Sequence, residues 1–202
     1  MRYKVITISR EFGSGGRLVG ERLAEDLGFK FYDKSLIHLA AAQSGLDPAT
    51  LEKAEEEATS KFLFNLAIGG YVASGVFSDV NVPICDQVFF AQSKVIEELG
   101  ERGNCVIIGR CANYILRSRS DCARVFVYGK TEDRLQRIVR DYGIPQEEAS
   151  AKLAKMDKAR ANYYEHYTDE TWGSVKSYDL AVNTSFTGID GAVGIVKTLV
   201  GR

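Results

Sequence analysis

The fold is decided by residues 5–20, which read VITISREFGSGGRLVG. An apolar, β-branched run comes first, a glycine-rich turn follows it, and a helical pattern begins directly after the turn. Glycines let the backbone approach a ligand closely, and the first N–H groups of a following helix point toward that ligand. The stretch therefore predicts an anion-binding turn between a buried strand and a helix. An ordinary turn with flexible glycines is the alternative.

Two kinds of phosphate-binding turn compete for this stretch. The dinucleotide fingerprint G-x-G-x-x-G requires glycine or alanine where Leu18 stands, although Asp33 lies where a ribose-binding acid belongs. The P-loop pattern G-x-x-x-x-G-K-[ST] aligns its second glycine with Gly15. Arg10 then takes the place of its first glycine, and Gly16 takes the place of its lysine. Neither pattern matches in full, so these residues alone leave both open.

Strand-like and helix-like segments alternate along the rest of the chain. Short apolar runs rich in β-branched residues are typical of parallel strands that are covered on both faces. The predicted strands are residues 3–9, 30–32, 104–108, 123–128 and 179–183. The predicted helices are residues 17–27, 34–44, 86–102, 131–142, 146–167 and 189–200. This order predicts a three-layer α/β/α fold with a parallel five-stranded sheet and right-handed crossovers.

Composition limits the classes of function. The chain has 202 residues, 45% of them hydrophobic, which is typical of one globular domain. A net charge of -1 gives no basic footprint for nucleic-acid polymers or anionic membranes, so we expect small-molecule partners. The four cysteines lack CxxC spacing and only two histidines accompany them, which argues against a zinc site and a disulfide framework. No targeting or membrane-spanning pattern is present, so a cytoplasmic location is expected.

Several segments, taken in order, resemble one known family. They are residues 6–17 (ITISREFGSGGR), 31–34 (FYDK), 106–110 (VIIGR), 157–164 (DKARANYY), 172–173 (WG) and 178–185 (YDLAVNTS). Each is weakly specific by itself, but their order and spacing are similar to those of the cytidylate-kinase-like P-loop kinases, relatives of bacterial cytidylate kinase. The resemblance covers nearly the whole chain and is weakest between residues 46 and 83.

The resemblance implies a P-loop NTPase fold and transfer of the γ-phosphoryl group of ATP, with Mg²⁺, to CMP or dCMP. It also implies one kinase domain over residues 1–202, whose core is formed by residues 1–45, 84–145 and 174–202. Residues 46–83 are then a helical substrate-binding insertion, although an ordinary helical pair fits the same pattern. Residues 146–173 are then a helical lid. The oligomeric state is left open, a homodimer included.

The same resemblance assigns roles to individual residues. It assigns binding of the ATP phosphates to Gly13, Ser14, Gly15, Gly16 and Arg17. It assigns binding of the acceptor to Asp33, Arg110 and Asp157. It assigns catalysis to three positively charged residues, Arg17, Arg110 and Arg160. No residue is assigned to the metal ion. Arginine suits these roles because its planar, always-charged fork grips two phosphate oxygens at once.

Each assignment has a simpler structural alternative. Arg110 could form a surface salt bridge, Asp157 and Arg160 a local ion pair on one helical face, and Asp33 a helix cap. The sequence also departs from the family pattern at three positions. Leu18 replaces the P-loop hydroxyl, Cys111 replaces an aspartate that usually follows Arg110, and Leu153 replaces a lid arginine. A nucleotide-binding regulatory module, a kinase for a different small acceptor and a dinucleotide-dependent oxidoreductase therefore remain as alternatives.

Overall fold

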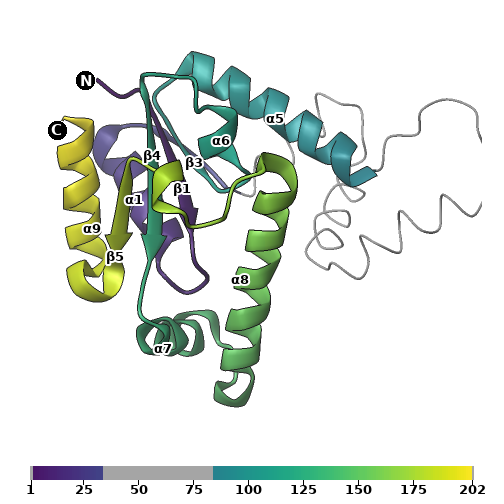
Figure 1. The fold of residues 1–202 in the computed structure, drawn as a ribbon. Coiled ribbons are helices and arrows are strands. Elements are labelled where there is room, and N and C mark those ends of the chain that lie inside the picture. Colours follow the sequence, from purple (N-terminus) through teal and green to yellow (C-terminus); the bar gives the residue numbers. More distant parts are fainter. Residues whose placement is uncertain (1, 34–83, 202) are drawn as a thin grey trace, which may run out of the picture.

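The structure is a computed structural model that describes residues 2–33 and 84–201 (Figure 1). Its centre is a five-stranded sheet in the order β2-β3-β1-β4-β5, and every neighbouring pair of strands is parallel. The strands are β1 (Val5–Arg10), β2 (Lys30–Tyr32), β3 (Cys105–Ile108), β4 (Cys122–Tyr128) and β5 (Leu180–Asn183). The predicted parallel sheet is thus confirmed. The predicted helix at residues 34–44 and the insertion at residues 46–83 lie outside the described residues.

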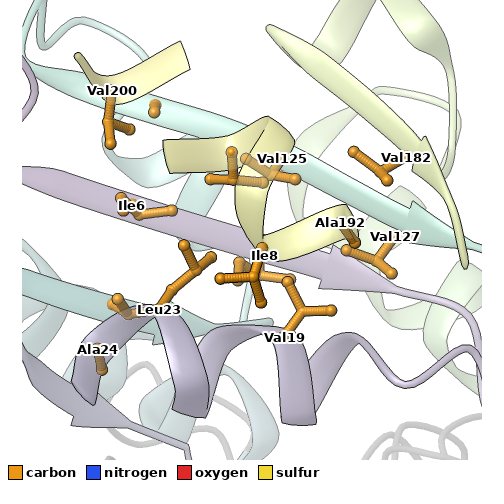
Figure 2. Packing of buried hydrophobic residues seen from close by; sticks show 14 of the residues in the cluster. Ile6, Ile8, Val19, Leu23, Ala24, Val125, Val127, Val182, Ala192 and Val200 are labelled. Carbon is orange, nitrogen blue, oxygen red and sulfur yellow. The ribbon is translucent and has the colours of Figure 1, made fainter. Parts of the chain in front are cut away.

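Helices cover both faces of the sheet, which confirms the three-layer expectation. One face carries α1 (Gly16–Leu27) and α9 (Thr184–Val200), whose apolar side chains pack against Ile6 and Ile8 of β1 (Figure 2). The other face carries α5 (Ile84–Arg102) and α6 (Ala112–Ile115), which pack against Val5. Each fully buried aliphatic side chain contributes about 1.5–3 kcal/mol to folding. Burial on both faces explains why the strands are apolar at nearly every position.

Two further helices follow β4: the first lies beyond the carboxyl end of that strand, and the second runs from the first back toward α5 (Figure 1). They are α7 (Thr131–Tyr142) and α8 (Gln146–Thr168). The first half of α8 packs on α7. Ala149 and Leu153 of α8 are buried against Ile138 of α7, together with Phe12. Leu153 therefore supports the base of α8, and an arginine there would introduce a charge into an apolar cluster.

The last helix begins five residues earlier than the sequence predicted. Asn183 caps it by accepting a hydrogen bond from the Ser185 N–H at 3.0 Å. Gly188, at φ 66°, interrupts the helical backbone. The apolar helical pattern is regular only from Ile189 onward, so the sequence predicted a later start. The short helix α6 and the 3₁₀ turn at Val175–Ser177 were not predicted. Within residues 2–33 and 84–201, every helix is too short or too polar to cross a bilayer.

Candidate active site

The glycine-rich turn lies at the carboxyl edge of the sheet, beside a cavity of about 700 Å³. In open parallel sheets ligands bind at this edge. The turn and the start of α1 line part of the cavity, and residues at or after the ends of β1, β2 and β3, together with residues of α7 and α8, line the rest. The lining residues are Arg10, Glu11, Phe12, Gly13, Gly15, Gly16, Arg17, Phe31, Asp33, Arg110, Tyr142 and Arg160. Four of them are arginines, so the cavity is suited to an anion.

The turn between β1 and α1 is shaped by glycine and by internal hydrogen bonds. Gly13 and Gly15 have φ values of 75° and 81°, which side-chain-bearing residues rarely adopt. The buried Ser14 hydroxyl donates to the Glu11 carbonyl at 2.8 Å and accepts from the Gly16 N–H at 3.4 Å. Thr184 donates to the Ser14 carbonyl at 2.7 Å, which joins the turn to α9. Ser14 thus shapes the turn from inside, while the three glycines assigned to the ATP phosphates line the cavity.

A buried ion network attaches the turn to α7 and α8. Arg134, only 4% exposed, donates to the Phe12 carbonyl at 2.8 Å and pairs with Glu11 at 3.1 Å. It also pairs with Asp157, whose carboxylate accepts from the Phe12 N–H at 2.7 Å. Burial is the main reason that the pKa of Glu11 is raised above its usual value. Asp157, which the sequence assigned to the acceptor, is therefore engaged with the turn in this structure.

Arg160 lies one turn along α8 from Asp157 and faces the same region. Its Nη1 donates to the main-chain carbonyl of Arg10 at 3.0 Å, and its guanidinium lies over the Phe12 ring, 5.5 Å from the centroid. Burial lowers the pKa of Arg160 from its ordinary value. A second cavity of about 220 Å³ adjoins the first and shares Arg10, Arg110 and Arg160 with it. Two of the three predicted catalytic arginines thus lie between the two cavities.

Arg110 lies in a segment after β3 whose backbone has positive φ angles. Gly109, Arg110 and Cys111 have φ values of 71°, 57° and 55°, so three consecutive residues are left-handed. Such a conformation costs about 1–3 kcal/mol for each non-glycine residue and is concentrated at functional sites. The Cys111 thiol is buried, which raises its pKa to about 12. The residue that stands in place of the family's aspartate is therefore a neutral thiol beside the smaller cavity.

Arg17 and Asp33 form the outer wall of the larger cavity. Arg17 Nε donates to Asp33 at 2.9 Å, and Arg17 Nη1 pairs with Glu21 at 3.2 Å. The Arg17 guanidinium also lies 5.7 Å from the centroid of the Phe31 ring. Asp33 reaches a second arginine, Arg10, at 3.8 Å. Every predicted site residue except Ser14 and Asp157 thus lines this cavity, and those two bond to the turn itself.

Arg10 is the arginine of this cavity that the sequence interpretation missed. Its side chain enters both cavities from the end of β1. Burial, followed by the nearby charge of Arg160, lowers the pKa of Arg10 from 12.5 to about 9. A strongly shifted pKa in a cleft is typical of functional sites. The sequence did contain a signal for Arg10. The P-loop pattern loses its lysine at Gly16, and a cation, Arg10, stands at the position of its first glycine.

The aromatic residues of α8 are largely engaged in packing. The Tyr167 ring stacks on Phe89 at 4.0 Å, and its hydroxyl donates to Asp86 at 3.0 Å. The Tyr164 hydroxyl donates to Glu170 at 2.7 Å and accepts from Asn113. Tyr163, Tyr164 and Trp172 also line the smaller cavity. That cavity is therefore lined by aromatic side chains as well as by arginines.

Known sequences similar to this chain are kinases. The sequence model of the "Cytidylate kinase-like family" matches residues 5–186. The cytidylate kinase of Thermococcus kodakarensis is 25% identical over 97% of this chain and 87% of its own length. The cytidylate kinase of Pyrococcus furiosus is 26% identical over 97% of this chain and 88% of its own length.

Solved structures show the same architecture. An uncharacterized protein from Eubacterium ventriosum has a TM-score of 0.70 and 25% identity, with 98% of this chain and 99% of that chain covered. Shikimate kinase from Acinetobacter baumannii, solved with shikimate, has a TM-score of 0.51 and 20% identity over 98% of this chain and 93% of its own. The second likeness concerns the fold alone.

Proposed function

The chain belongs to the cytidylate kinase-like family, and we propose that it transfers the γ-phosphoryl group of ATP to CMP or dCMP. The observation that carries the proposal is the cavity at the sheet edge, where a glycine-rich turn meets Arg10, Arg17, Arg110 and Arg160. Phosphoryl transfer requires positioning and neutralisation of charge more than covalent help from the protein. A pocket rich in arginine and bounded by backbone N–H groups meets that requirement.

The donor phosphates bind at the turn. The first N–H groups of α1 have no intrahelical partner, and the positive end of the helix dipole lies with them. Gly13 and Gly15 let the turn pack closely, because a Cβ atom would lie 2.8 Å from the Arg134 carbonyl oxygen at residue 13 and 2.4 Å from Ile189 Cδ1 at residue 15. The backbone that they shape lines the cavity and is open to the phosphates. Arg17 adds a positive charge at the start of α1 and is oriented by Asp33. Mutation at any of these positions would affect the triphosphate more than the adenosine.

The acceptor binds on the side of Arg110 and the smaller cavity. Arg110 holds the acceptor phosphate, and the aromatic side chains that line that cavity face the nucleoside. Arg160, from the proposed lid at residues 146–173, neutralises the phosphoryl group as it moves between the two nucleotides. The Arg160 contact with the Arg10 carbonyl places it against the donor turn. Asp157 serves the acceptor indirectly, because its bond to the Phe12 N–H positions α8 against the turn.

The attacking atom is an oxygen of the acceptor phosphate. A phosphate monoester has its second pKa near 6, so at neutral pH this oxygen needs no general base. No serine or cysteine nucleophile is required. Cys111 stays protonated, since its pKa is about 12, and contributes shape to the acceptor pocket without supplying a charge.

The residues present fit a magnesium ion that arrives with ATP. Two carboxylates line the larger cavity: Glu11 is held by Arg134 and the Gly129 N–H, and Asp33 pairs with Arg17 and Arg10. Asp33 would hold the ion only by exchanging one of these arginines for it. Mg²⁺ commonly binds through one or two carboxylates together with substrate phosphates. When bound, the ion neutralises the β- and γ-phosphate oxygens. Leu18 supplies no hydroxyl, so we infer that the nucleotide provides most of the ligands.

An acceptor panel tests the proposed function. ADP release is measured with CMP, dCMP, UMP, AMP and shikimate at saturating ATP and Mg²⁺. We expect the highest kcat/KM with CMP or dCMP. A preference for shikimate would assign the second candidate, a kinase for another small acceptor. ATP binding without ADP release from any acceptor would assign a regulatory module, which the loss of the P-loop lysine and hydroxyl at Gly16 and Leu18 favours.

A further inference from the structure

Gly16 stands where the P-loop pattern has its lysine, and the space above it is filled by Arg10. A Cβ atom added to Gly16 would lie 2.6 Å from Arg10 Cβ and 3.1 Å from Arg10 Cγ. Real Cβ atoms essentially never approach other heavy atoms so closely as the first distance. A Cβ atom at residue 16 would also lie 3.1 Å from Val127 Cβ, so Gly16 is required by the close approach of α1 to β1 and β4. The stem of Arg10 fills part of the space that a side chain at residue 16 would need.

The far end of Arg10 is located by a second glycine. A Cβ atom added to Gly109 would lie 2.1 Å from Arg10 Nη1, so the guanidinium is packed against the end of β3. Gly109 has φ 71°, which also favours glycine. The stem of Arg10 thus lies over the start of α1, while its charged group lies beside Arg110. The Arg10 side chain thus extends from the turn proposed to bind the donor to the side of the cavity proposed to bind the acceptor.

The charges around Arg10 favour an anion. Arg160 and Arg110 both lower its pKa, and Asp33, 3.8 Å away, is the acid that opposes them most. Three guanidinium groups thus gather around space shared by the two cavities. A bound phosphate would relieve their repulsion, and each charge-assisted hydrogen bond to it would be short and strong.

We propose that Arg10 replaces the P-loop lysine as the cation that contacts the β- and γ-phosphates of the donor. The proposal rests on the proposed function for the identity of the donor. In this chain the positive charge of the motif is then supplied by Arg10, at the end of β1, six residues before the position where the P-loop pattern has its lysine. Arginine offers a fork that can bridge two phosphate oxygens, which lysine does not.

Isothermal titration calorimetry with ATP, inorganic tripolyphosphate and adenosine tests this assignment without turnover. A hydrogen bond to a charged group contributes about 1.5–3 kcal/mol, so Arg10→Met should weaken ATP and tripolyphosphate binding roughly 10- to 150-fold. Adenosine binding should not change. The matched control is Arg102→Met, because Arg102 is exposed, pairs with Glu98 and precedes β3 at the opposite edge of the sheet. Arg10→Lys, which keeps the charge, should recover part of the affinity.

A position swap gives the sharper test. Gly16→Lys alone should weaken tripolyphosphate binding, because the new side chain collides with Arg10. Arg10→Gly combined with Gly16→Lys restores the first glycine and the lysine of the P-loop pattern, but not its hydroxyl, and should bind tripolyphosphate more tightly than Arg10→Gly or Gly16→Lys alone. Additive losses in the double variant, or unchanged tripolyphosphate affinity in folded Arg10→Met, would overturn the assignment. If Arg10→Met loses affinity for ATP and tripolyphosphate but not for adenosine, and the wild type turns over no monophosphate, the role of Arg10 is supported and the proposed kinase activity is refuted.

Discussion

Arg134→Met removes the centre of the ion network that attaches the phosphate-binding turn to α7 and α8. Methionine preserves most of the length and apolar stem of arginine. It removes the donors to the Phe12 carbonyl, Glu11 and Asp157. Two partly buried carboxylates, with side-chain exposures of 25% and 19%, then face each other without their shared cation. The variant therefore measures how strongly the network holds the turn.

The expected loss of stability is large for one surface-helix residue. Breaking a buried ion pair by removing one partner costs about 3–5 kcal/mol, because the remaining charge stays buried. For a domain of this size each kcal/mol shifts Tm by about 2–4 °C, so Tm should fall by about 6–20 °C. Thermal unfolding followed by circular dichroism measures the shift. Arg140→Met on the same helix is the matched control, since Arg140 is exposed and pairs with its neighbour Asp141.

The loss should also depend on pH. Burial already raises the pKa of Glu11 above 4.5, and removing Arg134 raises it further. A carboxyl whose pKa is raised binds its proton more readily in the folded state, so folding is favoured as the pH falls toward that pKa. The Tm difference between Arg134→Met and wild type should therefore shrink between pH 7 and pH 5. A Tm within 2 °C of the Arg140→Met control at neutral pH would refute the network as the turn's support.

Three further variants separate catalysis, acceptor binding and folding. Arg160→Ala should lower kcat by roughly 10³–10⁵ with small changes in both KM values, since such an arginine acts mainly in the transition state; steady-state kinetics with a near-normal kcat would contradict this. Arg110→Ala should raise the KM for the acceptor about tenfold or more and leave the ATP KM nearly unchanged, and an equal rise in both would remove Arg110 from the acceptor side. Asn183→Ala deletes the cap of α9 and should lower Tm by about 2–4 °C at a cost of about 1 kcal/mol, whereas an unchanged Tm would mean that the cap is dispensable.

The strands and the anion-binding turn could be predicted because their signals are local. β1 carries the apolar, β-branched residues Val5, Ile6 and Ile8, and Gly13 follows its end after two residues, so residue type and backbone freedom indicate both features. The early start of α9 was missed because Gly188 interrupts the apolar period after the Asn183 cap. Arg110 directly follows a predicted strand, which favours a place at the carboxyl edge of the sheet. The role of Arg160 came from the resemblance to a known family, because no local pattern indicates it.

The remaining features of the site depend on contacts between distant residues. Arg134 looks like an ordinary helix-surface arginine in the sequence, yet it is buried against residues 23 and more than 120 positions away. Asp157 is read from the family pattern as an acceptor residue, and only the fold brings its carboxylate to the Phe12 N–H. The place of Arg10 also depends on the fold, because only the structure shows that its stem lies against Gly16 and its guanidinium against Gly109.

The most direct test of phosphoryl transfer at this cleft follows the label from [γ-³²P]ATP in the presence of CMP and Mg²⁺. The account predicts that the label appears in CDP and that Arg160→Ala loses this product by roughly 10³-fold or more while remaining folded. Label released only as inorganic phosphate, or CDP formed equally well by Arg160→Ala, would contradict it.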